Sequence, residues 1–396
     1  MTTHPNGDAF TSTPLLTHEV GSLDKLGWRA KSVAGKKLEE KDLEEARSWG
    51  RRVGVEGYER LIELLQQSPL TREQKDEVKR WSSRYGVRMQ ESAGLDVVYD
   101  GEQQRTEMYQ WAVAHSEGFE WRGSVRAFDN KYYSKAAVVA PISLKEPYHN
   151  EEFAFLKDVA RAELKVPITG AYTIGDWSFD ERYFSEHDLR VPHTERKAAR
   201  KEARRRLIVD VARNMIRPNL EALIGLGARW IQLDEPGGST EPDELDLFTE
   251  SFNESVRGLD AVFSTHLCFS DYQLFFPGIE AMTACKQFAV GFANYDSRDL
   301  GVSDEARPGY QVIGRFRDLS YRPSLGLGVL DIHTDFIEPP ELVRDRIPYA
   351  VEVFGDPGRI QVTPDCGLRT RSWDVAYRKL VNMVEGTRMA KKELGL

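Results

Sequence analysis

The sequence predicts one (β/α)8 barrel, a TIM barrel, spanning residues 1–396 as a single domain, and two observations predict it. Eight short apolar runs alternate with longer segments of helical periodicity. Several of these runs are apolar on consecutive residues, which is typical of parallel strands covered on both faces. Alternating strands and helices imply parallel pairing with right-handed crossovers, and eight such units can close into a barrel. An open doubly wound sheet is the alternative, but no Gly-rich phosphate turn follows the first run.

The predicted strands are Leu15–Val20, Leu95–Tyr99, Val166–Thr169, Trp230–Leu233, Val262–Thr265, Phe288–Ala293, Leu327–Ile332 and Ile360–Thr363. Two stretches are additional to the eight strand–helix units of a minimal barrel. Residues 32–85 are charged and helical in pattern, with Pro69-Leu70-Thr71 as a helix boundary and N-cap, so we expect a helical insertion there. Residues 121–147 mix aromatic and β-branched residues around Asp129-Asn130, which predicts an inserted β-hairpin.

Composition narrows the class of protein. The net charge of −9 argues against nucleic acid as a main partner, because duplex binding needs a basic face. No apolar run approaches the roughly 18 residues that a membrane span needs. Residues 1–10 lack the basic and apolar regions of a signal peptide, so we expect a soluble cytoplasmic protein. A basic helix is expected over Thr194–Ile216, either as a solvated face or as a docking surface for an acidic protein.

Two of the three cysteines lie at the ends of predicted strands, where active-site residues of a barrel are expected. An odd, small number of cysteines does not fit a disulfide framework. His266 and Cys268 stand two apart at the end of a predicted strand, so their side chains are expected on the same face. Cys366 follows the last predicted strand in Pro364-Asp365-Cys366-Gly367. Because strand ends meet at one mouth of a barrel, the three can share a metal ion. We expect Cys285 to serve packing.

Imidazole and thiolate ligands suit zinc better than magnesium or calcium. A Cys2His set with one open position is typical of a reactive rather than a structural zinc. The other predicted strand ends are also polar: they carry Gly21-Ser22, Asp100-Gly101-Glu102, Gly170 with Trp177, Asp234-Glu235-Pro236 and Asp331-Ile332-His333. Together these residues predict an active site at the carboxyl ends of the strands.

These segments resemble the catalytic barrel of cobalamin-independent methionine synthase over nearly the whole chain. The matching segments are His18-Glu19-Val20-Gly21-Ser22, Asp100-Gly101-Glu102, Thr169-Gly170 with Asp176-Trp177-Ser178-Phe179, Gln232-Leu233-Asp234-Glu235-Pro236, Thr265-His266-Leu267-Cys268, Asp331-Ile332-His333 and Pro364-Asp365-Cys366-Gly367-Leu368. The long enzymes of this family have an additional N-terminal half, so the chain resembles a single-barrel version.

The resemblance implies a role for each matching residue. His266, Cys268 and Cys366 match the family's zinc ligands. Gly21 and Ser22 match the loop that holds the carboxylate of the amino acid, and Glu102 and Asp234 match the carboxylates that hold its ammonium group. His333 matches a histidine that assists proton transfer near the methyl donor, and Trp177 matches an aromatic residue of the methyl-folate site.

The sequence departs from the family at the fourth zinc ligand, which is a glutamate after the sixth strand. An ungapped match puts Tyr295 at that position, and tyrosine is a poor ligand unless ionised, with a reference pKa of about 10. Asp296 or a water molecule can take the position instead. The identity of the fourth ligand therefore stays open at this point.

The resemblance implies a zinc-dependent transfer of a methyl group to the thiol of homocysteine. The donor is expected to be a methyl-folate or a methyl-corrinoid protein, which the basic helix can dock. An epoxyalkane:coenzyme M transferase, which shares the zinc chemistry, is the alternative enzyme. Glu102 and Asp234 favour an amino-acid thiol, because coenzyme M has no ammonium group. A non-catalytic zinc-storing protein is the alternative from another class.

Overall fold

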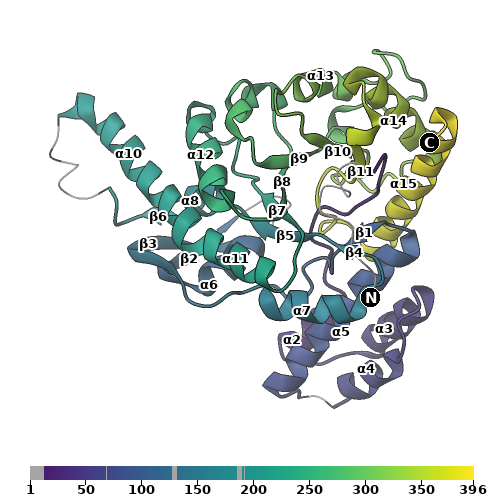
Figure 1. The fold of residues 1–396 in the computed structure, drawn as a ribbon. Coiled ribbons are helices and arrows are strands. Elements are labelled where there is room, and N and C mark those ends of the chain that lie inside the picture. The colour runs from purple at the N-terminus through teal and green to yellow at the C-terminus, as the bar shows by residue number, and fades with distance from the viewer. Residues whose placement is uncertain (1–12, 68, 127–131, 185–189, 191) are drawn as a thin grey trace.

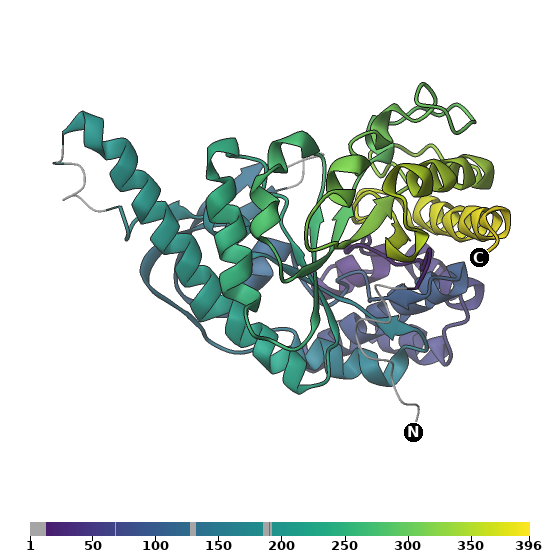
Figure 2. The same ribbon diagram turned by 45° about the horizontal axis from the view of Figure 1, so that its top comes forward.

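The computed structural model describes residues 13–67, 69–126, 132–184, 190 and 192–396 (Figure 1). It contains a six-stranded sheet, a three-stranded sheet and a two-stranded sheet. Helices lie on the outside of the six-stranded sheet in both views (Figures 1 and 2). The predicted mixed α/β class with parallel strands is confirmed.

The six-stranded sheet is parallel throughout and forms the centre of the molecule. Its order is β11-β10-β9-β8-β7-β5. Every residue of these strands except Lys286 is buried, which explains why their sequences are largely apolar at consecutive positions. The strands are β5 (Val166–Thr169), β7 (Trp230–Asp234), β8 (Val262–Leu267), β9 (Cys285–Val290), β10 (Ser324–Gly328) and β11 (Ile360–Thr363).

Two shorter parallel pairings lie beside this sheet. Strand β1 (Val97–Val98) pairs with β4 (Glu163–Leu164), which ends two residues before β5 begins. Isolated parallel bridges join Thr17 to Val362 of β11 and His18 to Val97 of β1. The run Leu15–Val20 was predicted as a strand, but it forms these bridges only. The side chain of Asp96 bonds the Thr17 N–H at 2.8 Å and so takes the place of a ladder partner.

Two strands begin earlier than predicted. Strand β9 starts at Cys285 rather than Phe288, and β10 starts at Ser324 rather than Leu327. Val329 and Leu330, which follow β10, are fully buried although they belong to a loop. An apolar run therefore indicated burial correctly, but it misplaced the strand because buried loops and buried strands have the same composition.

Helices cover the sheet between successive strands. Helix α10 extends away from the rest of the molecule in both views and continues through a π-helix at Ala212–Ile216 (Figures 1 and 2). Helix α10 therefore contains most of the predicted basic helix. The covering helices are α7 (Asn150–Val159), α8 (Ala171–Asp176), α10 (His193–Val211), α11 (Arg217–Gly225), α12 (Leu245–Val256), α13 (Ile313–Arg317), α14 (Pro340–Phe354) and α15 (Trp373–Leu394).

The N-terminal part of the chain is helical, and its helices gather on one side of the molecule (Figure 1). Thr71 caps α5 with a capping box that includes Gln74, so the helix start predicted at Pro69-Leu70-Thr71 is where the structure places it. The helices are α2 (Gly27–Val33), α3 (Glu40–Arg52), α4 (Tyr58–Leu65) and α5 (Arg72–Ala93).

An antiparallel pair follows the short helix α6 (Met108–Ala114). Strand β2 (Ser116–Arg126) pairs with β3 (Tyr132–Leu144), and β6 (Phe179–Asp180) adds to β3 in parallel. This pair starts at residue 116, five residues before the predicted hairpin, and the register shifts twice near Gly118 and Gly123. The start was predicted from the aromatic and β-branched residues that begin at Trp121, and the strand extends before them through the bulge near Gly118. The turn expected at Asp129-Asn130 lies outside the described residues.

Among the residues that the structure describes, no helix combines the length and the apolar character that crossing a membrane requires.

Candidate functional site

The structure brings together His266, Cys268 and Cys366, which are 100 residues apart at the extremes. His266 belongs to β8, Cys268 follows that strand directly, and Cys366 follows β11. One ligand atom from each lies within 4.8 Å of the others, and in the described part of the chain these residues are the one such group of three or more. The distances are short enough for the three atoms to bind one ion.

His266 is oriented as a metal ligand would be. Its Nδ1 lies 3.0 Å from the carbonyl oxygen of Ala289. Because a carbonyl can only accept, Nδ1 carries the proton and Nε2 carries the lone pair. Nε2 is buried and makes no hydrogen bond in the structure. A metal-bound histidine typically has its other nitrogen fixed by such an acceptor, so the imidazole fits a metal ion at Nε2.

The two thiols need a cation to ionise together. Cys268 and burial both raise the pKa of the Cys366 thiol well above its usual range. A divalent ion reverses this effect, because a coordinated thiol loses its proton. Cys285 takes no part in the group: it is buried, its thiol donates to the carbonyl oxygen of Gln287 at 3.2 Å, and burial raises its pKa to about 12.

Asp365 fixes the turn that carries Cys366. Its carboxylate accepts the backbone N–H groups of Phe292, Ala293 and Asn294 at 3.1, 3.0 and 2.7 Å. Burial raises the pKa of Asp365 to about 7, while these hydrogen bonds oppose the rise. The carboxylate thus ties the end of β11 to the loop after β9.

Tyr295 and Asp296, the residues considered for a fourth ligand, lie in that loop. The Asp296 carboxylate is buried and paired with Arg307 and, at 3.0 Å, with Arg346. Tyr295 is 48% exposed, and its ring stacks on Phe269 with 6.2 Å between the centroids. Asp296 is engaged by two arginines and is not part of the His/Cys group. The fourth position stays a prediction.

Glu102 and Asp234 face the turn at Gly21. A Cβ atom on Gly21 would lie 3.8 Å from Glu102 Oε1 and 4.0 Å from Asp234 Oδ2, so both carboxylates lie on the same side of this residue. A Cβ atom on Gly367 would lie 2.8 Å from the backbone nitrogen of Ser22. The turn that follows Cys366 therefore packs directly against the Gly21-Ser22 turn, which requires glycine at residue 367.

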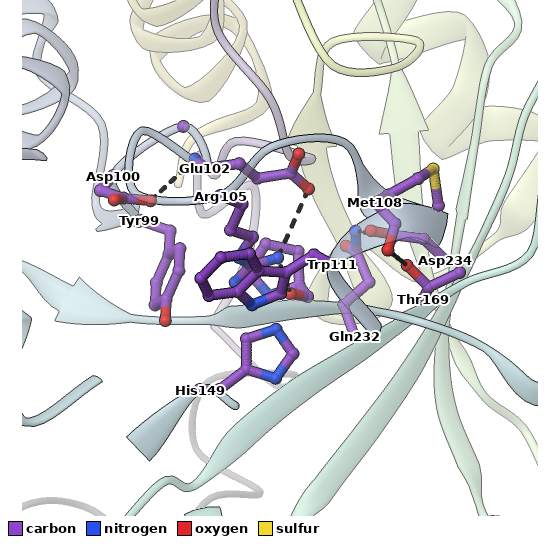
Figure 3. A network of polar contacts seen from close by, with 12 residues as sticks. Tyr99, Asp100, Glu102, Arg105, Met108, Trp111, His149, Thr169, Gln232 and Asp234 are labelled. Atoms are coloured by element: carbon purple, nitrogen blue, oxygen red, sulfur yellow. Dashed lines mark hydrogen bonds and ion pairs between the residues drawn. The ribbon is translucent and has the colours of Figure 1, made fainter. Parts of the chain in front are cut away.

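Glu102 is held by its backbone and its side chain. It adopts a left-handed conformation with φ of 60°, which is uncommon for a residue other than glycine. Its N–H donates to Asp100 at 2.7 Å, and the Lys25 ammonium donates to its carbonyl oxygen at 3.1 Å. The Arg105 guanidinium lies 3.5 Å from Glu102 Oε1 (Figure 3). Arg105 in turn pairs with Glu152 of α7 at 2.6 Å.

Asp234 connects this carboxylate pair to the His/Cys group. It ends β7 and is paired in register with His266 of β8. Burial raises the pKa of Asp234 to about 7, with Glu102 contributing to the rise and His266 opposing it. Two buried carboxylates that face one point make a strong site for a cation, because neither charge is screened by water.

Glu235, next to Asp234, has a different role. Its carboxylate accepts the N–H of Tyr172 at 3.1 Å and both the N–H and the hydroxyl of Thr173, so it caps the N-terminus of α8. Trp177 ends this helix, and its ring lies 5.1 Å from that of Tyr133 in β3. The helix capped by Glu235 thereby places Trp177 against the antiparallel pair.

His333 lies near the His/Cys group. It is exposed, and its N–H donates to the Asp331 carboxylate at 2.9 Å. Its ring centroid is 4.7 Å from that of Phe269, the residue after Cys268. The His333 ring therefore packs against Phe269, the neighbour in sequence of the candidate ligand Cys268.

Three residues of this region were not singled out from the sequence: Arg105, Glu152 and Lys165. Each is charged and almost completely buried. For Lys165 a signal existed, since a lysine directly precedes the apolar run of β5. For Arg105 and Glu152 the sequence offers no comparable signal, because they meet across 47 residues.

Comparison with known proteins agrees with this arrangement. The sequence profile of the cobalamin-independent synthase catalytic domain matches residues 57–389. A methionine synthase from Thermoplasma volcanium is 37% identical over 300 residues, which cover 74% of this chain and 83% of that protein. Methionine synthases from Thermoplasma acidophilum and Thermococcus kodakarensis are 36% and 34% identical, over 80% and 85% of this chain and 91% and 90% of those proteins.

Solved structures show the same fold. A B12-independent methionine synthase from Shewanella, in complex with selenomethionine, superposes with a TM-score of 0.72 over 96% of this chain and 99% of that one, at 20% identity. A putative vitamin-B12-independent methionine synthase from Listeria monocytogenes gives a TM-score of 0.61 at 17% identity, over 95% of this chain and 98% of that one. From the profile match and the identity to the archaeal enzymes, the chain belongs to the cobalamin-independent methionine synthase family of methyltransferases.

Proposed function

We propose that the chain is a zinc-dependent methyltransferase that transfers a methyl group to the thiol of homocysteine and forms methionine. The observation that carries the proposal is the His266, Cys268 and Cys366 group lying next to two buried carboxylates, Glu102 and Asp234. The names of the archaeal relatives and the selenomethionine bound to the Shewanella protein support the same substrate.

Zinc is the metal that the donor set favours. Two sulfurs and one imidazole nitrogen are the ligands of reactive zinc sites, and the unpartnered Nε2 of His266 supplies the nitrogen. When bound, zinc keeps the acceptor thiol ionised near neutral pH, where a free thiol with a pKa of about 8.5 is mostly protonated. Tyr295, Asp296 or a water molecule remains the proposed fourth ligand.

Glu102 and Asp234 bind the ammonium group of homocysteine, and the Gly21-Ser22 turn binds its carboxylate. A buried carboxylate pair attracts an ammonium group strongly and offers nothing to a thiol that lacks one. Coenzyme M carries a sulfonate and no ammonium group. The carboxylate pair therefore disfavours the alternative of an epoxyalkane:coenzyme M transferase.

Trp177 and His333 serve the methyl donor. Trp177 offers an aromatic face beside Tyr133 to a flat ring such as that of a methyl-folate. His333 is exposed and able to give a proton to the leaving group. Alignment of donor and acceptor contributes up to about 7–11 kcal/mol to such transfers. A methyl-corrinoid protein is the second donor that we propose to test.

We also propose that the strands close into an eight-membered barrel. The pairing order runs from β11 through β5, and the bridges at Thr17 and His18 link β11 to β1, which pairs with β4. A closed barrel explains why residues from β7, β8 and β11 meet at one mouth.

An assay of donors against acceptors tests the proposal. Zinc-loaded protein is incubated with methyl-folate or methylcobalamin as donor and homocysteine or coenzyme M as acceptor. We expect methionine from homocysteine with one donor, no methylated coenzyme M, and no product from Cys366→Ser, which removes one thiolate but keeps the size of the side chain. Full activity of Cys366→Ser, or a preference for coenzyme M, would contradict the proposal.

A further inference from the structure

A buried cation is linked to Asp234 through one intervening side chain, Gln232, and takes no part in the proposed chemistry. Lys165, directly before β5, is fully buried. Its ammonium donates to Gln232 Oε1 at 2.6 Å and to the carbonyl oxygen of Glu19, and it lies 3.8 Å from Glu19 Oε1. Burying a charge is costly unless its partners compensate, so this lysine needs a physical explanation.

Lys165 on one side and two acceptors on the other fix which way the Gln232 amide points. An ammonium group only donates, so the atom of Gln232 that faces it is the oxygen. The amide nitrogen of Gln232 then faces the other way and donates to the Val20 carbonyl and to Asp234 Oδ1, at 2.7 Å each. Both of those atoms are acceptors, so the Gln232 amide is hydrogen-bonded through its oxygen and its nitrogen.

The consequence falls on Asp234. With Oδ1 engaged by Gln232, Oδ2 is the oxygen directed to the side of Gly21 that Glu102 also faces. Without Lys165, the buried Oε1 of Gln232 has no donor, and the amide that holds Asp234 Oδ1 loses one of its three hydrogen bonds. An amide that is held less firmly leaves Oδ2 of Asp234 less well aimed at the point that Glu102 also faces. Gln232 and Asp234 are shown together in Figure 3.

We propose that Lys165 is a positioning residue for homocysteine binding, which acts through Gln232 to hold Asp234 aimed at the ammonium group of the substrate. Glu19 is the acidic residue beside Lys165: both of its carboxyl oxygens are buried without a hydrogen bond, Oε1 lies 3.8 Å from the ammonium, and burial raises its pKa to about 8 while Lys165 opposes the rise. The inference rests on the proposed function, because it names a residue that serves the same substrate.

A double-mutant cycle tests it. In the full chain, we expect Lys165→Met to lower kcat/KM for homocysteine by about tenfold or more, the loss typical when a buried charge loses a hydrogen bond. In an Asp234→Asn background the same change is expected to have an effect of less than about twofold, because its route is already removed. The KM for the methyl donor should not change in either background. The dissociation constant for methionine, measured by calorimetry for the same four proteins, gives this comparison without turnover.

The control is Lys379→Met. Lys379 is another fully buried lysine, paired with Glu338 at 2.7 Å, and it makes no contact with Gln232. Its effect should be the same factor in both backgrounds. If Lys165→Met does not fold, Lys165→Met with Glu19→Gln removes the unpaired carboxylate and is used in its place.

The outcomes separate the two proposals. If the unmutated chain forms no methionine from homocysteine with either donor, the proposed function fails. If it does form methionine and Lys165→Met has equal effects in both backgrounds, the positioning role of Lys165 is overturned and the proposed function stands.

Discussion

Replacing Asp234 with Asn tests how the carboxylate pair recognises the substrate. Asp234 is 6% exposed, and its Oδ2 faces the same side of Gly21 as Glu102 Oε1. Asn has nearly the same shape and retains an oxygen for the Gln232 hydrogen bond, but it has no charge. The change therefore removes one of two charges available to an ammonium group and leaves the packing intact.

The size of the effect follows from burial. A hydrogen bond to a charged group contributes about 1.5–3 kcal/mol when both partners are protected from water. At about 1.4 kcal/mol for each factor of ten, the KM for homocysteine should rise by roughly 10- to 150-fold. Glu102 still binds the ammonium group, so the variant keeps measurable activity.

The same substitution changes the pH dependence. The pKa of Asp234 is about 7 because burial disfavours its charged form. The ionised form binds the ammonium group, so kcat/KM for homocysteine in the unmutated protein should rise as the pH increases through about 7. Asn does not titrate, and we expect this rise to flatten in the variant. Below about pH 7 Asp234 becomes protonated, so kcat/KM of the unmutated protein falls there.

Initial rates of methionine formation, measured against homocysteine concentration from acidic to mildly alkaline buffers, give both quantities. Asp246→Asn, the same change at an exposed carboxylate of α12, is the matched control and should leave both unchanged. An Asp234→Asn variant with an unaltered KM and an unaltered pH profile would refute the assignment of the ammonium site.

Three other expectations concern single side chains. Trp177→Ala should raise the KM for a methyl-folate donor while the KM for homocysteine stays the same, and a change confined to homocysteine would contradict the donor role. Glu235→Ala removes the cap of α8 and should lower the free energy of unfolding in urea by about 1–2 kcal/mol; an unchanged midpoint would mean that the cap is not needed. Tyr295→Glu should keep or raise zinc affinity in a chelator competition, and a large loss would show that the tyrosine ring is needed where it packs on Phe269.

The features predicted best from the sequence are those set by residues close together in the chain, such as strand bounds and the spacing of the candidate ligands. Strands β5 and β11 have the predicted bounds because their apolar runs end where turn residues begin. His266 and Cys268 were expected together from their spacing, and Cys366 from its position after the last strand. The strand β10 was predicted too late in the chain, because its apolar run continues into Val329 and Leu330, which are as buried as the strand before them.

What the sequence did not predict depends on pairs that are far apart in the chain. Lys165 meets Gln232 across 67 residues, and Arg105 meets Glu152 across 47. A charged residue is usually exposed, so composition gives no reason to expect these pairs in the interior. The path of the chain brings them together, and no local pattern encodes that contact.

Zinc-edge X-ray absorption of the zinc-loaded protein, before and after addition of homocysteine, tests the central claim most directly. We expect one tightly bound zinc with two sulfurs and one imidazole nitrogen, supplied by Cys268, Cys366 and His266. Homocysteine should add a third sulfur. A zinc shell that contains no cysteine sulfur, or one that does not change when homocysteine is added, would contradict the account.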